Sequence, residues 1–138
     1  MKESPVEIFN DKTLKKCLKY WKKKLFLTDW IIKVGLVEPD EMPEKEFAGI
    51  NSMNFVSKEA VIKISKFPKD ERKTFIAKVY DEHTLVHELL HCKYNFLECS
   101  GSYESTYVDT LDHQQLEELA KTLIMVKYNL PFNWFNNP

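Results

Sequence analysis

The sequence predicts an α+β fold that consists of an N-terminal helix, a three-stranded antiparallel sheet and two further helices. Three observations predict it. Apolar residues recur at helical spacing near the N-terminus, β-branched residues gather between positions 30 and 64, and helical patterns return after position 81. A chain of 138 residues can bury roughly two thirds of its unfolded surface, so we expect one domain that spans residues 1–138.

The composition is that of an ordinary globular protein. The net charge is −1, so the overall charge does not require a polyanionic partner. No apolar run approaches 18 residues, and the N-terminus lacks the apolar core of a signal peptide, so we expect no membrane span. Three cysteines, Cys17, Cys92 and Cys99, are an odd and sparse set that favours buried free thiols in a reducing compartment. We therefore expect a cytoplasmic monomer.

The first helix is predicted to begin at Asn10 or Asp11, either of which can cap it. Its apolar residues follow one another at steps of four, three and four, and they are Leu14, Leu18, Trp21 and Leu25. The opposite face carries a run of lysines, namely Lys12, Lys15, Lys16, Lys19, Lys22 and Lys23. A solvated helix face is the commoner outcome for such a run, and contact with nucleic acid through its phosphates is the alternative.

Three segments are predicted to be strands. Trp30–Val37 is rich in β-branched residues, 48–55 alternates weakly, and 60–64 alternates better. A loop with two prolines, 38–46, separates the first strand from the second. We expect these strands to form an antiparallel sheet joined by short turns. Residues 70–80 fit either a loop or a short helix.

The pattern His87-Glu88-Leu89-Leu90-His91 dominates the second half of the chain. On a helix, the two imidazoles lie four residues apart on one face, where they can bind one Zn²⁺. Glu88 can then reach the open coordination position and act as a general base. A solvated histidine pair is the alternative, but the leucines and Val86 around the pattern predict a largely buried helix. Buried His and Glu need partners, and a metal supplies one.

This helix is predicted to begin near Asp81, whose carboxylate can cap the first turn, and to end near Phe96 or Leu97. We expect residues 98–110 to form a loop, because they show no periodicity. A last helix is predicted from about Asp112 to Tyr128, where Asn129-Leu130-Pro131 stops it. The aromatic tail that follows is expected to fold back on the core, with Phe132, Trp134 and Phe135.

A catalytic zinc site needs a third protein ligand. His83 shares a face with His87, but three successive histidines on one helix span about 12 Å and cannot all reach one metal. In the last helix, Asp112 and Gln115 resemble a capping box, flanked by a staple of Leu111 and Leu116. That places His113 in the first turn, where the helix dipole keeps its ring neutral. Glu117 shares its face and is either the neighbour of a ligand or the ligand itself.

These motifs make the chain, from about residue 10 to residue 128, resemble a minimal zinc protease of the gluzincin type, as found among phage and mobile-element zincins. The resemblance rests on His87-Glu88-Leu89-Leu90-His91 and on a second helix with Glu117-Glu118-Leu119-Ala120. It implies a zincin-like core, a zinc cofactor and a third ligand on the second helix. The family spacing puts that ligand at His113, where glutamate is usual, and its acidic neighbour at Glu117. Three-histidine sites of this kind resemble those of Spartan-type proteases.

We therefore expect zinc-dependent hydrolysis of peptide bonds, with protein or peptide substrates and Glu88 as the general base. Tyr103 and Tyr107 are candidate oxyanion donors, although exposed loop tyrosines are the commoner case. Family analogy suggests that strand 60–64 offers its edge to an extended substrate. Two alternatives stay open: a binding module with a structural zinc, and a DNA-associated protease of the Spartan kind that uses the lysine face.

Overall fold

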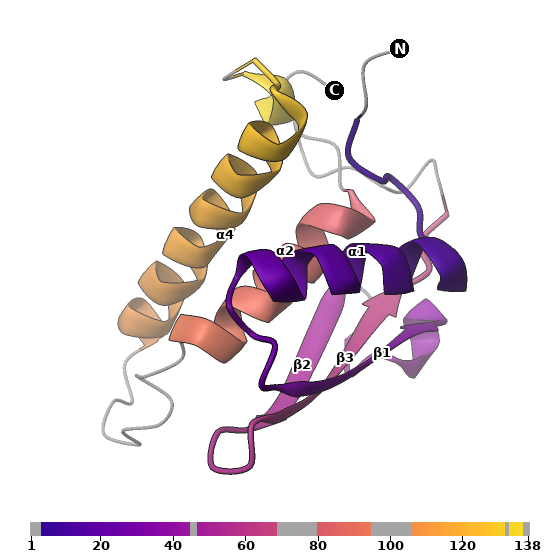
Figure 1. Ribbon diagram of the computed structural model, residues 1–138, viewed down its shortest axis with the longest axis vertical. Helices are drawn as coiled ribbons and strands as arrows, with labels where there is room; N and C mark the ends of the chain where they lie inside the picture. Colours follow the sequence, from indigo (N-terminus) through magenta and orange to yellow (C-terminus); the bar gives the residue numbers. More distant parts are fainter. Residues whose placement is uncertain (1–3, 45–46, 69–79, 95–105, 132, 137–138) are drawn as a thin grey trace.

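The fold is that of a computed structural model, which describes residues 4–44, 47–68, 80–94, 106–131 and 133–136, and of 106–112 and 136 the backbone alone (Figure 1). The expected α+β arrangement is confirmed. Its elements in chain order are α1 (Asp11–Lys24), β1 (Ile31–Val37), the 3-10 helix η1 (Pro39–Glu41), β2 (Gly49–Asn54), β3 (Glu59–Ser65), α2 (Asp81–Tyr94), α4 (Thr106–Tyr128) and the 3-10 helix η3 (Trp134–Asn136).

The sheet is mixed, so the prediction of a wholly antiparallel sheet is wrong. Its strand order is β1-β3-β2, with β3 antiparallel to β2 and parallel to β1. A short turn joins β2 to β3, which permits only antiparallel pairing. The connection from β1 to β2 includes η1 and is long enough to place β2 at the opposite edge of the sheet, on the other side of β3. Because β3 is central and paired on both sides, the expectation that strand 60–64 offers a free edge is also wrong.

Two helices, α1 and α2, cover one face of the sheet, and α4 packs along α2 (Figure 1). The central strand alternates accordingly: Ala60, Ile62 and Ile64 are buried, whereas Val61 and Lys63 are exposed. Almost the whole surface of α2 is covered, since eleven of its fourteen residues are buried. The helix that carries the histidine motif is therefore the central element of the core, as its apolar surroundings predicted.

The first helix begins where the sequence indicated. Asn10 is its cap and forms a capping box with Thr13, each side chain accepting a hydrogen bond from the other's backbone N–H at 2.9 Å. The predicted apolar face packs inward, with Leu14, Trp21 and Leu25 buried. Of the six lysines on the opposite face, Lys22 is half-buried and the others are exposed. Within the described residues, none of the helices combines the length and the apolarity that a membrane crossing requires.

The last helix is longer than predicted. It begins at Thr106, so the expected loop is wrong over 106–110. The rest of that expected loop, 98–105, lies outside the described residues, as does the predicted end of α2 beyond Tyr94. Asp112 is consequently inside the helix, which removes the predicted cap, the staple and the first-turn place of His113. The lack of periodicity in this stretch misled the prediction, because local sequence is a weak guide to where a helix begins.

The end of α4 agrees with the prediction. Asn129 adopts a left-handed conformation with φ of 53°, and Leu130 N–H donates to the Met125 carbonyl at 3.0 Å. This is a Schellman cap, which satisfies the last carbonyls of the helix. The tail then returns to the core as expected: Phe135 is buried and Trp134 is half-buried, while Phe132 lies outside the described residues.

A buried carboxylate, that of Glu82, ties α2 to three other segments. It accepts hydrogen bonds from Trp21 Nε1 at 2.8 Å, Lys127 Nζ at 2.7 Å, the Tyr128 hydroxyl and the Val6 N–H at 3.0 Å. Burial favours the neutral acid, but these hydrogen bonds, led by that from Lys127, outweigh it and hold the pKa of Glu82 below its usual value. The charged group therefore joins α1, α4 and the N-terminal segment to the first turn of α2.

Candidate metal centre

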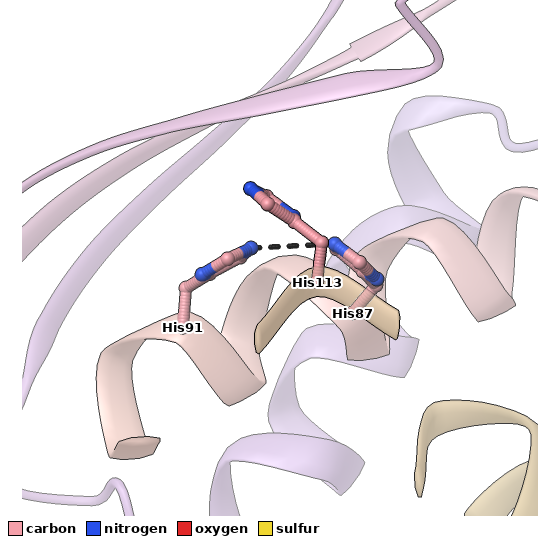
Figure 2. Close-up of side chains that lie close together, drawn as sticks. All are labelled: His87, His91 and His113. Carbon is pink, nitrogen blue, oxygen red and sulfur yellow. Dashed lines mark hydrogen bonds between the residues drawn. The ribbon is translucent and has the colours of Figure 1, made fainter. Parts of the chain in front are cut away.

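Two of the predicted ligands come from α2. His87 and His91 lie one turn apart on the same face, and their Nε2 atoms are 3.3 Å from each other (Figure 2). His91 is buried with 5% of its surface exposed, and His87 is half-buried. The helical spacing of the motif is thus realised, with both rings turned toward a common point.

The third predicted ligand, His113, comes from α4. Its ring stacks on that of His87 with 5.8 Å between centroids, and it meets His91 edge-on at 4.8 Å. One nitrogen from each of the three rings lies within 4.8 Å of the other two. Figure 2 shows the rings converging from two helices. Because α4 begins earlier than expected, His113 lies about two turns into the helix, and the packing of α4 on α2 positions its ring.

The spacing of these nitrogens fits a zinc ion. Ligand nitrogens about 2.0–2.1 Å from a tetrahedral Zn²⁺ are about 3.3–3.4 Å from one another. The separation between His87 Nε2 and His91 Nε2, 3.3 Å, has that value. The His113 nitrogen lies within 4.8 Å of the other two, and its side chain is exposed. Within the part of the chain that is described, the group consists of these three histidines.

The electrostatics of the site also favour a metal. Burial, and to a smaller extent the neighbouring His87 and His113 rings, lowers the pKa of His91 to about 4. A ring with that pKa is neutral at pH 7 and keeps a lone pair for a ligand bond.

Glu117 lies behind His87. Its Oε2 is 2.9 Å from His87 Nδ1, and its Oε1 is 2.6 Å from His83 Nε2. Burial would raise the pKa of the Glu117 carboxyl, but hydrogen bonds from His83 and His87 outweigh it and hold that pKa well below its usual range. A carboxylate on Nδ1 keeps the proton there and leaves Nε2 of His87 available. His113, and not Glu117, is therefore the side chain that joins the cluster of nitrogens.

Glu88 lies on the side of α2 that β2 approaches. Its side chain is 7% exposed, and its backbone carbonyl accepts a hydrogen bond from Asn51 Nδ2 at 2.9 Å. The strand approaches closely at Gly49, where an added β-carbon would lie 2.7 Å from Thr84 Cγ2 and 3.4 Å from Glu88 Cγ. Only glycine permits this approach, so β2 borders the helix that carries the motif.

Some residues of the site were not assigned from the sequence. The contact of His83 with Glu117 was missed, although both sit four residues from predicted ligands, His87 and His113. Gly49 and Asn51 gave no signal, because their roles depend on how β2 docks on α2. Of the candidate oxyanion donors, Tyr103 lies outside the described residues, and Tyr107 is described by its backbone alone. Cys99 also lies outside the described residues.

No protein-family model matches the chain, and no match was found among curated proteins or solved structures. An inference about function therefore depends on the geometry of the site.

Proposed function

We propose that this chain is a zinc-dependent peptidase of the gluzincin type. The observation that carries the proposal is the convergence of His87, His91 and His113 from two helices, with Glu88 between the first two in sequence. Three protein ligands and an open position are the usual arrangement of a catalytic zinc site, whereas a structural site is closed by four protein ligands.

Each residue then has a defined task. His87, His91 and His113 would hold the metal ion, and Glu117 would keep the proton on Nδ1 of His87, so that Nε2 of His87 is left for the metal. A zinc ion held there supplies a Lewis acid that polarises the substrate carbonyl and lowers the pKa of water toward 7. Glu88 accepts the proton of the attacking water and passes it to the departing amine.

The proposed substrate is a protein or peptide in an extended conformation. The central strand β3 is paired on both sides, whereas β2 is an edge strand of the sheet and packs on α2, the helix that carries the motif. We therefore propose that β2 presents its edge to the substrate. An extended peptide can add to such an edge through backbone hydrogen bonds. We further propose that the protein is a monomer and is located in the cytoplasm. The buried free thiols of Cys17 and Cys92 support the location.

Metal analysis of purified protein, together with cleavage of an unfolded protein such as reduced casein, tests the proposal. The wild-type chain should bind one zinc and cleave, and Glu88→Gln should bind zinc equally well and lose turnover by at least about a hundredfold. His113→Ala should lose zinc, and a normal zinc content in that variant would remove His113 from the ligand set. Stoichiometric zinc without any cleavage would favour a non-catalytic binding module.

A second candidate, a DNA-associated protease, is supported by the exposed lysines on α1. Lys15, Lys16 and Lys19 are solvent-exposed on the face that points away from the core. Each phosphate neutralised by a lysine makes the affinity more dependent on salt. DNA binding that weakens with salt and is lost when these three are replaced by Gln would support this function. The absence of binding at low salt would exclude it.

A further inference from the structure

The histidine that the proposed metal site leaves unused on α2 is His83. It lies in the first turn, one turn before His87, with 8% of its surface exposed. Its Nε2 is 2.6 Å from Glu117 Oε1, and the other oxygen of that carboxylate is 2.9 Å from His87 Nδ1. A continuous series of contacts therefore leads from the metal-facing ring through Glu117 to His83.

We propose that His83 is a positioning residue for the metal centre, which acts by fixing the Glu117 carboxylate against His87. The inference rests on the proposed zinc site and extends it by a residue outside the ligand set. An ionised carboxylate only accepts hydrogen bonds, so both contacting nitrogens carry protons. That fixes the protonated nitrogen as Nε2 in His83 and as Nδ1 in His87, and Nε2 of His87 is left for the metal.

Glu117 needs a second contact because its own side chain is long and its side-chain surface is 40% exposed. A glutamate anchored through one oxygen alone retains rotamers in which the carboxylate turns toward solvent, and ordering it then opposes metal binding. His83 holds the second oxygen and removes those rotamers before the metal binds. Preorganisation of this kind raises affinity without any contact to the ligand itself.

His83 is in turn held rigidly by the C-terminal segment. Its ring lies 5.2 Å from that of Phe135, which is 4% exposed and meets Tyr80 edge-on at 6.0 Å. The anchor of Glu117 is therefore part of a packed aromatic cluster and does not rely on a mobile surface side chain.

Two variants separate the donor of His83 from its packing. His83→Phe keeps a ring against Phe135 and removes the N–H, whereas His83→Gln offers an N–H to Glu117 without a ring. Zinc affinity is measured by competition with a chromophoric chelator, and Co²⁺ absorption reports the ligand geometry. We expect His83→Phe to weaken zinc binding about tenfold, and His83→Gln to bind nearly as tightly as the wild type. Thermal unfolding verifies that each variant folds, and His83→Met replaces His83→Phe if that variant does not.

A double-mutant cycle tests whether the effect passes through Glu117. Glu117→Ala should weaken zinc binding by about 10–100-fold, and adding His83→Phe should weaken it no further. Unchanged affinity in folded His83→Phe, or an equal loss in the Glu117→Ala background, would overturn the inference. If the wild-type chain binds no zinc, the inference and the metal centre fail together. A zinc site that His83→Phe weakens in a protein without peptidase activity supports the inference and removes only the proposed function.

Discussion

Gly49→Ala tests the close approach of β2 to the helix that carries the motif. The added methyl would lie 2.7 Å from Thr84 Cγ2, whereas carbon atoms in contact prefer about 3.5–4.0 Å. The strand and helix must therefore separate locally by about 1 Å, and overpacking of this kind costs about 1–3 kcal/mol. For 138 residues the unfolding entropy is about 0.3 kcal/mol per degree, so we expect Tm to fall by about 3–10 °C.

The chain offers two controls for this experiment. Gly35→Ala places a methyl in β1 where, beyond the adjacent residues, no atom of the described part of the chain lies within 4 Å, so it should leave the thermal midpoint unchanged or slightly raised. Thr84→Ser removes the clashing methyl but keeps the hydroxyl that donates to the Tyr80 carbonyl at 3.3 Å. Combined with Gly49→Ala, it should recover most of the lost stability. Differential scanning calorimetry measures all four proteins, and equal midpoints for Gly49→Ala and Gly35→Ala would refute the reasoning.

Three further predictions follow from contacts described above. Glu82→Gln leaves Lys127 without its buried partner and should destabilise the chain by about 3 kcal/mol in urea unfolding. Because the folded pKa of Glu82 lies below 4.5, the stability that its charge contributes is complete above about pH 4.5 and is lost as the pH falls through the folded pKa. The stability of the variant should therefore depend less on pH in that range. Zinc at one hundred times its dissociation constant should stabilise the wild type by about 2.7 kcal/mol, raising Tm by about 9 °C, and EDTA should reverse this; an unchanged midpoint would contradict the metal centre. Asn129→Ala forces a residue with a β-carbon and no amide into the left-handed cap and should cost about 1 kcal/mol, whereas Asn129→Gly should be neutral or stabilising in the same unfolding assay.

Much of the fold was predictable because local patterns were strong. The cap at Asn10, the strand segments, the start of the motif helix and the stop at Asn129 each follow from signals within a few residues. The direction of β1 was not predictable in this way, since it depends on how the connection through η1 crosses the sheet. The early start of α4 was missed because residues 106–110 show no helical periodicity, and intrinsic propensity is a weak guide to where a helix begins.

The candidate site divides along the same line. His87 and His91 follow from spacing on one helix, and His113 was selected from the family spacing, although the first-turn argument for it was wrong. The contacts behind the ligands, that of His83 with Glu117 above all, required the relative placement of α2 and α4. Pairs of residues four apart on two helices indicate which faces can meet, but only tertiary structure shows that they do.

The burial of α2 on nearly all sides has a consequence for how such a protein can diversify. Eleven of the fourteen residues of this helix are buried, and the same helix carries the histidine motif. Under the proposed peptidase function, substitutions in this helix would compromise folding before they altered substrate preference. Under the same proposal, differences in substrate preference would arise at exposed positions outside α2, where a changed side chain leaves the interior undisturbed.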